Sequence, residues 1–121
     1  MNAIQQLIIS YQTRDAFWTA AENVENDRQH QDYFLRILRA RNNVALLMED
    51  ESRIRQLADD GNPYMQYALA RLHDCLQFQP NSNDLKQHYY ASAYLTGRIA
   101  DARAFLALAY RDGDYGEADV E

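Results

Sequence analysis

The stretch "MQYALARLHD" at 65–74 has a close counterpart in "ARAFLALAYRD" at 102–112, and this pair decides the predicted fold. Leu106 in the second stretch stands 37 residues after Leu69 in the first. Both stretches carry apolar residues three and four positions apart, which is typical of helices. A period in the mid-thirties is typical of arrays of helix–turn–helix repeats. The sequence therefore predicts a stack of helical hairpins.

Helical spacing continues outward from this pair along the whole chain. Seven helices are predicted, at about 4–11, 17–24, 33–38, 44–58, 63–76, 84–95 and 98–111. A cap near Thr13 or Asp15 is expected to separate the first two. The clearest break is "DGNP", where Gly61 suits a left-handed cap and Pro63 suits the first turn of a helix. No segment alternates apolar and polar residues over the length of a strand, so no strands are expected.

The composition agrees with long helices and excludes some classes of partner. Among 121 residues, 47% are hydrophobic, which is enough for a core, and only 4 are Gly and 2 are Pro. The formal net charge is −6. This sign argues against nucleic acid, which is bound through cationic contacts to phosphate, and against an anionic membrane surface.

The few signals for location predict a cytoplasmic protein. Cys75 is the single cysteine, so no disulfide framework can form within the chain. The N-terminal "MNAIQQLIIS" lacks the basic region of a secretory signal. No stretch approaches the ~20 apolar residues of a membrane helix.

The repeated stretches resemble the Sel1-like repeats, relatives of the tetratricopeptide repeats. Helix A of that family reads roughly Ala-x-x-x-Leu-Gly-x-x-Tyr-x-x-Gly, and helix B carries a Trp-Tyr pair and ends in Ala-Ala-x-x-Gly. The matches to helix A and the following loop are Ala102, Leu106, Ala107 in place of Gly, Tyr110, Gly113, Gly116 and Asp119. The matches in the preceding repeat are Leu69, Ala70, His73 in place of Tyr, Tyr89–Tyr90, Ala93 and Gly97. The resemblance covers about 57–121.

The resemblance implies an all-α fold, a right-handed α-solenoid of antiparallel helical hairpins. We expect 1–121 to form a single helical-repeat domain, with degenerate repeats in 1–56. In the family, helix B follows the loop aspartate, whereas this sequence stops two residues after Asp119. We therefore expect the sequence to be part of a longer protein; the alternative is a natural acidic tail after a final capping helix.

No metal or cofactor site is predicted. The acidic stretch near the C-terminus does not fit a calcium loop, because Glu117 stands where an EF-hand begun at Asp112 needs glycine. His73 and Cys75, with His88 on the next predicted helix, do not provide the second pair of ligands typical of zinc. A core cysteine and a histidine that replaces the repeat tyrosine are the simpler interpretation.

No catalytic residues are predicted either. None of the four serines stands beside a histidine or in a Gly-rich elbow, and there is no Gly-rich phosphate loop. The paired carboxylates, such as Glu49–Asp50–Glu51, lie at predicted helix ends, where solvation explains them. The sequence predicts that the chain is not an enzyme.

A partner surface is predicted on the fifth and seventh helices. Tyr64 and Tyr67 lie off the repeat pattern and are candidates for a surface contact, since tyrosine is favoured at interfaces. The resemblance implies that helix A lines the concave face, where outward positions include Gln66, Arg71 and Arg103. Two such arginines can bind an acidic group or a C-terminal carboxylate. Ordinary solvated surface is the alternative for these positions.

The predicted function is that of a non-catalytic protein–protein interaction module, an adaptor or scaffold that binds a protein or peptide on the solenoid surface. The alternative is a structural segment that braces a catalytic or regulatory domain elsewhere in a longer parent chain. A small enzyme or metal protein is a third possibility.

Overall fold

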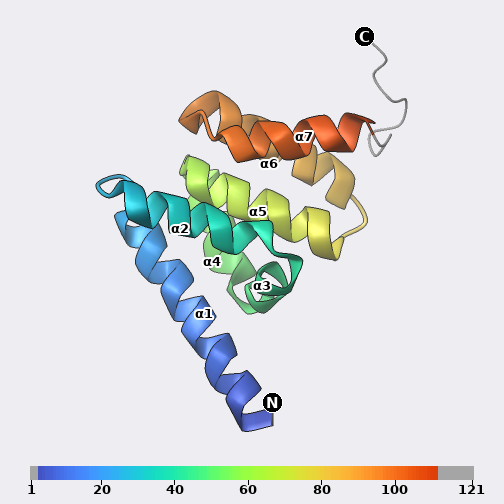
Figure 1. Cartoon of the computed structure of the whole chain (residues 1–121). Helices are drawn as coiled ribbons and strands as arrows, with labels where there is room; N and C mark the ends of the chain where they lie inside the picture. Colours follow the sequence, from blue (N-terminus) through green and yellow to red (C-terminus); the bar gives the residue numbers. More distant parts are fainter. Residues whose placement is uncertain (1–2, 112–121) are drawn as a thin grey trace. The chain divides into compact units, whose positions relative to one another are not determined.

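The computed structural model describes residues 3–111, with side chains at residue 4 and at 12–108. Over this part of the chain there are seven α-helices, one short 3-10 helix and no strand (Figure 1). The predicted all-α class is confirmed. The chain divides into two compact units, the first ending at Glu49 and the second beginning at Asp50. None of the helices within 3–111 combines the length and the apolar composition that a bilayer crossing requires.

The first unit contains three helices around aromatic side chains. They are α1 (Ala3–Asn23), α2 (Arg28–Arg39) and α3 (Arg41–Leu46). Phe17 of α1 is fully buried and stacks on Phe34 of α2, with ring centroids 5.1 Å apart. Among the side chains described for this unit, the other buried apolar ones are Ala20, Val24, Ile37, Leu38, Val44 and Leu47. Asp27 caps α2, because its Oδ1 accepts a hydrogen bond from Gln29 N at 2.8 Å.

The prediction of two helices before residue 25 is wrong. A single helix, α1, continues from Ala3 to Asn23 through the expected cap at Thr13 or Asp15. Thr and Asp cost only a few tenths of a kcal/mol in a helix interior, about 0.7 kcal/mol at most, whereas glycine or proline would cost more. Neither glycine nor proline occurs between Ala3 and Asn23, so neither of these helix breakers interrupts α1.

The second unit is a row of antiparallel helices. The 3-10 helix η1 (Met48–Asp50) leads into α4 (Glu51–Asp59), α5 (Pro63–Leu76), α6 (Ser82–Gly97) and α7 (Ala100–Arg111). Figure 1 shows that α5, α6 and α7 alternate in direction. The helix α5 packs on both α4 and α6, and every residue from 65 to 73 is buried. This helix therefore forms the centre of the unit.

The predicted helix at 44–58 is divided in the structure. It is replaced by α3, η1 and α4, with a tight 3-10 turn at Met48–Asp50. The acidic run Glu49–Asp50–Glu51 explains where α4 begins, because carboxylates are favoured in the first turn of a helix, near the positive end of its dipole.

The turn before α5 has the predicted form. Gly61 has φ +103°, and Pro63 occupies the first turn of α5. Asn62 caps the helix, since its Oδ1 accepts hydrogen bonds from Tyr64 N at 3.0 Å and Met65 N at 3.2 Å. The end of α6 approaches this turn closely, because an added Cβ on Gly97 would lie 2.5 Å from Pro63 Cβ. The α5–α6 hairpin is thus fixed at its open end.

Candidate functional site

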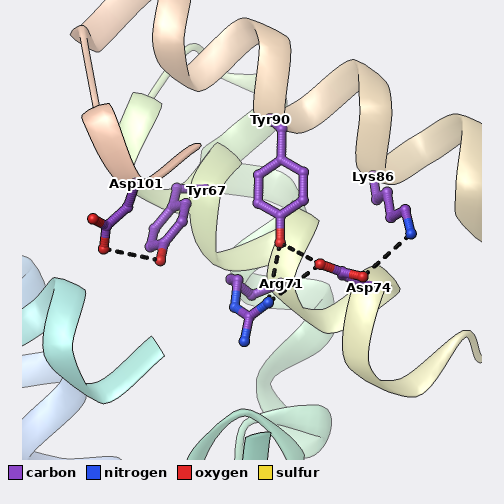
Figure 2. A network of polar contacts seen from close by, with 6 residues as sticks. All are labelled: Tyr67, Arg71, Asp74, Lys86, Tyr90 and Asp101. Atoms are coloured by element: carbon purple, nitrogen blue, oxygen red, sulfur yellow. Dashed lines mark hydrogen bonds and ion pairs between the residues drawn. The ribbon is translucent and has the colours of Figure 1, made fainter. Parts of the chain in front are cut away.

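A half-buried carboxylate near the end of α5 binds three side chains (Figure 2). Asp74 Oδ2 accepts hydrogen bonds from Tyr90 Oη at 2.8 Å and from Arg71 Nη1 at 3.2 Å. Asp74 Oδ1 accepts one from Lys86 Nζ at 3.2 Å. Arg71 is 5% exposed and Lys86 only 1%. Because a buried cation is costly unless it is paired, Asp74 is what stabilises both of them inside the unit.

The spacing of these four residues follows from the two helices that hold them. Arg71 and Asp74 are three residues apart on α5, and Lys86 and Tyr90 are four apart on α6, so each pair shares a helix face. Tyr90 Oη also accepts a hydrogen bond from Arg71 Nη1 at 3.3 Å. Burial raises the pKa of Tyr90 well above its ordinary value, and the charge of Asp74 raises it further. The phenol therefore stays protonated and donates to the carboxylate.

Aromatic rings connect α7 to the same cluster. The guanidinium of Arg71 lies over the ring of Phe105, 3.9 Å from its centroid. Phe105 also stacks on Tyr90, with centroids 5.8 Å apart and an interplanar angle of 13°. Tyr67 Oη donates a hydrogen bond to Asp101 Oδ2 at 3.3 Å. These contacts hold α5, α6 and α7 together, so the cluster is a structural support and leaves little exposed polar surface.

A second set of rings lies around His73 of α5. The imidazole stacks on Phe78 with centroids 4.7 Å apart, and its Nδ1 forms a hydrogen bond of 3.2 Å with Ser82 Oγ. Tyr89 lies parallel to it at 6.3 Å. Burial lowers the pKa of His73, and the charge of Arg55 lowers it further. The neutral imidazole is therefore favoured in the folded protein.

Tyr89 joins α6 to α4. Its Oη donates to Asp59 Oδ1 at 2.8 Å. Burial raises the pKa of Tyr89 to about 12, and the hydrogen bond to Asp59 contributes to the increase. This phenol is also neutral in the folded unit. Tyr89 and Tyr90 thus both have structural roles in the second unit.

Three of the five residues predicted to contact a partner are buried. Gln66 is 8% exposed and its Nε2 donates to Ala58 O at 3.1 Å. Tyr67 is fully buried, and Arg71 pairs with Asp74. The prediction that Gln66, Tyr67 and Arg71 point outward is wrong, because α5 is covered by α4, α6 and α7 rather than lining an open face. Tyr64 is half-buried and Arg103 is exposed, so only these two are accessible.

The accessible arginine belongs to a surface that the sequence did not reveal. We call it the Arg–Tyr patch; it consists of Ala91, Tyr94, Leu95, Arg98 and Arg103. Four of these residues follow the spacing i, i+3, i+4, i+7, which places them along one face of α6 and its end. Leu95 is 67% exposed, and Arg98 and Arg103 are exposed. The spacing is readable in the sequence, but it does not distinguish an outer face from a core face.

Two guanidinium groups lie near one ring in the patch. Arg98 Cζ is 5.8 Å and Arg103 Cζ 5.7 Å from the centroid of the Tyr94 ring. Within residues 3–111, neither arginine forms an ion pair with a carboxylate. The patch therefore presents two positive charges and an apolar side chain, on a chain whose net charge is −6.

The described part of the chain brings no three His, Cys, Asp or Glu side chains together in a way that could hold a metal ion. The acidic stretch considered for calcium, from Asp112 on, lies outside the described residues, as do Gly113, Gly116 and Asp119 of the predicted repeat loop. No protein-family model, curated protein or solved structure matches the chain.

Proposed function

We propose that the chain is a non-catalytic interaction module, built from Sel1-like helical hairpins, that binds another protein or a peptide. The observation that carries this proposal is the Arg–Tyr patch. An exposed leucine beside a half-exposed tyrosine and two arginines is the composition favoured at protein interfaces, where aromatic residues and arginine are enriched.

The packing of the second unit supports the same proposal. The polar and aromatic contacts of Asp74, Tyr90 and Phe105 fix α5, α6 and α7 against one another. Such contacts hold the patch on a rigid surface, and a rigid surface loses less conformational entropy when a partner binds. The proposed binding surface is the exposed face of α6 together with the start of α7, and it does not include α5.

A site-specific photo-crosslinking experiment tests the proposal. A photoreactive amino acid replaces Leu95 in the whole chain, and the chain is irradiated in cells of its source. We expect a discrete covalent adduct with another protein, detected as a band of higher mass and identified by mass spectrometry. The matched control replaces Ser52, which is exposed on α4 of the same unit.

Equal adducts from the two positions, or none from either, would contradict a binding surface on α6. The isolated chain with the same replacement shows whether an adduct is a homodimer, since only a second copy is then available.

A further inference from the structure

The arginines, the tyrosine and the leucine of the patch together define what kind of partner fits it. We propose that the Arg–Tyr patch binds an acidic segment of a partner protein, in which Asp or Glu side chains stand within one helical turn of a large apolar residue. This inference rests on the proposed function, since it names the partner chemistry of the same surface.

The charges of the patch argue for carboxylates. Arg98 and Arg103 have no carboxylate partner among the described residues, although 18 of the 121 residues are Asp or Glu. A guanidinium binds a carboxylate through two parallel hydrogen bonds, which an ammonium cannot do. Since both groups lie within 6 Å of the Tyr94 centroid, a single segment can contact both.

The position of the two guanidiniums near the Tyr94 ring favours such binding. An arginine beside a ring has fewer accessible rotamers than one in open solvent, and its stem covers the aromatic surface. Less side-chain entropy is therefore lost when the carboxylate binds. Tyr94 acts here as a support that positions both charges.

The apolar part of the partner is set by Leu95 and Ala91. Leu95 is 67% exposed, and Ala91, one turn before it, is half-buried and small. A side chain of the partner can occupy the space above Ala91 and contact Leu95. A partner with charges alone would leave this leucine in water, so we infer an apolar residue beside the acidic ones.

The whole-chain charge argues against the other anions. Nucleic acid and anionic lipid carry dense charge over an extended surface, so they would also approach the acidic parts of a chain with net charge −6. A short acidic segment contacts the patch locally and is less affected. Nucleic acid and lipid are thus outcomes that the experiment must separate.

The test is a selection from random peptides of about twelve residues, or three helical turns, displayed on phage and bound to the whole chain. We expect enriched peptides to combine Asp or Glu with Leu, Ile or Phe. Synthetic copies are then measured by fluorescence anisotropy against the wild type, against R98Q/R103Q and against L95S. We expect about tenfold weaker binding to R98Q/R103Q, and binding to the wild type that weakens as salt rises.

The control is R28Q/R36Q, which removes the same charge from two exposed arginines of α2 and should bind as the wild type does. Glutamine suits position 98, where φ is +56°, because Gln77 already holds φ +45° at the end of α5. Circular dichroism establishes that each variant is folded before its binding is compared.

The outcomes separate the two proposals. Peptides that bind R98Q/R103Q as well as the wild type would overturn the acidic-partner inference and leave an interaction module with another surface. Selected peptides that lack acidic residues would also overturn the acidic-partner inference and leave the interaction module in place. A selection with no enrichment would overturn both proposals. An oligothymidine, or a vesicle of phosphatidylserine, that binds in an Arg98- and Arg103-dependent manner while acidic peptides do not would also overturn the inference.

Discussion

At the scale of single residues, the sequence indicates part of the role of Arg71. Arg71 and Asp74 are three apart on a predicted helix, and this spacing alone indicates an ion pair. The partners on α6, Lys86 and Tyr90, could not be predicted, because they lie 12 and 16 residues from Asp74 and meet it only in the folded hairpin. For the same reason, the sequence suggested an exposed arginine where the structure has a buried one.

Two glycines of the second unit are needed for different reasons, and substitution can tell them apart. An alanine at position 97 would place its Cβ 2.5 Å from Pro63 Cβ, so we expect G97A to lower the free energy of unfolding by about 2 kcal/mol. Gly61 has φ +103° but no atom within 4 Å of an added Cβ. There we expect a loss of about 1 kcal/mol for G61A, from the backbone alone. Urea denaturation measures both.

Asparagine provides the control, because it tolerates positive φ better than alanine does but is larger. G61N should therefore be more stable than G61A, whereas G97N should be no more stable than G97A. The reverse order at either position would show that the wrong cause has been assigned to that glycine.

The elements of the second unit were predicted more accurately than those of the first. The bounds of α5 match the predicted 63–76, since Gly61, Asn62 and Pro63 signal its start. The first unit has no such start signals, and the prediction divided α1 into two helices in error. Apolar spacing shows that a helix exists, but without glycine, proline or a used cap it does not show where the helix ends.

The repeat interpretation stays a prediction, and the positions of α5 and α7 that it aligns are only partly alike in burial. Met65 and Ala102 are both buried, at 1% and 0% exposure. Ala70 is buried, however, whereas Ala107 is exposed. The difference arises because α5 is covered on all sides, and burial depends on neighbouring helices that sequence periodicity does not specify.

The α5–α6 hairpin should lose stability in mild acid. Burial, and then the charge of Arg55, hold the pKa of His73 below 6.5, so the unfolded chain binds a proton at a pH where the folded chain does not. This contribution is fully present above pH 6.5 and falls as the pH drops below that value toward the pKa of the folded state. Urea unfolding between pH 8 and pH 5 should show the decrease (about the range in which histidine titrates).

The variant H73Q keeps an amide near Ser82 but cannot titrate, so its stability should vary less over this range. H88Q is the matched control, since His88 is exposed on α6, and it should behave as the wild type does. If the free energy of unfolding of H73Q changes with pH as steeply as that of the wild type, the effect belongs to other groups, such as carboxylates.

At the scale of the whole molecule, the chain divides into two compact units. The sequence predicts a single helical-repeat domain over 1–121, with degenerate repeats in 1–56, and this stays a prediction. The segment where the two units meet is helical on both sides and lacks the glycine or proline of a typical linker.

The single tryptophan makes the division testable. Trp18 lies in the first unit, in edge contact with Phe17, whereas Asp74 and its described partners lie in the second. We expect D74A to destabilise the second unit by about 3 kcal/mol, because Lys86 and Arg71 lose their carboxylate. The urea midpoint from Trp18 fluorescence should stay unchanged, while the far-UV circular dichroism shows an earlier phase.

The converse variant is F34A, which removes the ring stacked on Phe17. F34A should shift the urea midpoint measured by Trp18 fluorescence. The unfolding phase of the second unit, measured by far-UV circular dichroism, should stay at the same urea concentration. Equal shifts of both signals in D74A would mean that the two units unfold as one cooperative body.

The shared carboxylate has a consequence for evolution. Because Asp74 forms hydrogen bonds with residues of both helices, the effects of mutations at Arg71, Lys86 and Tyr90 depend on one another. Loss of the carboxylate should therefore lead to selection for new residues at those three positions. The loop from Gln77 to Asn81 takes no part in the hydrogen bonds described for this group. Descendants of this sequence should therefore accept insertions in that loop that keep the ring of Phe78 on His73, while the four residues substitute together. Coordinated substitution of this kind would identify distant relatives even after most of the sequence has diverged.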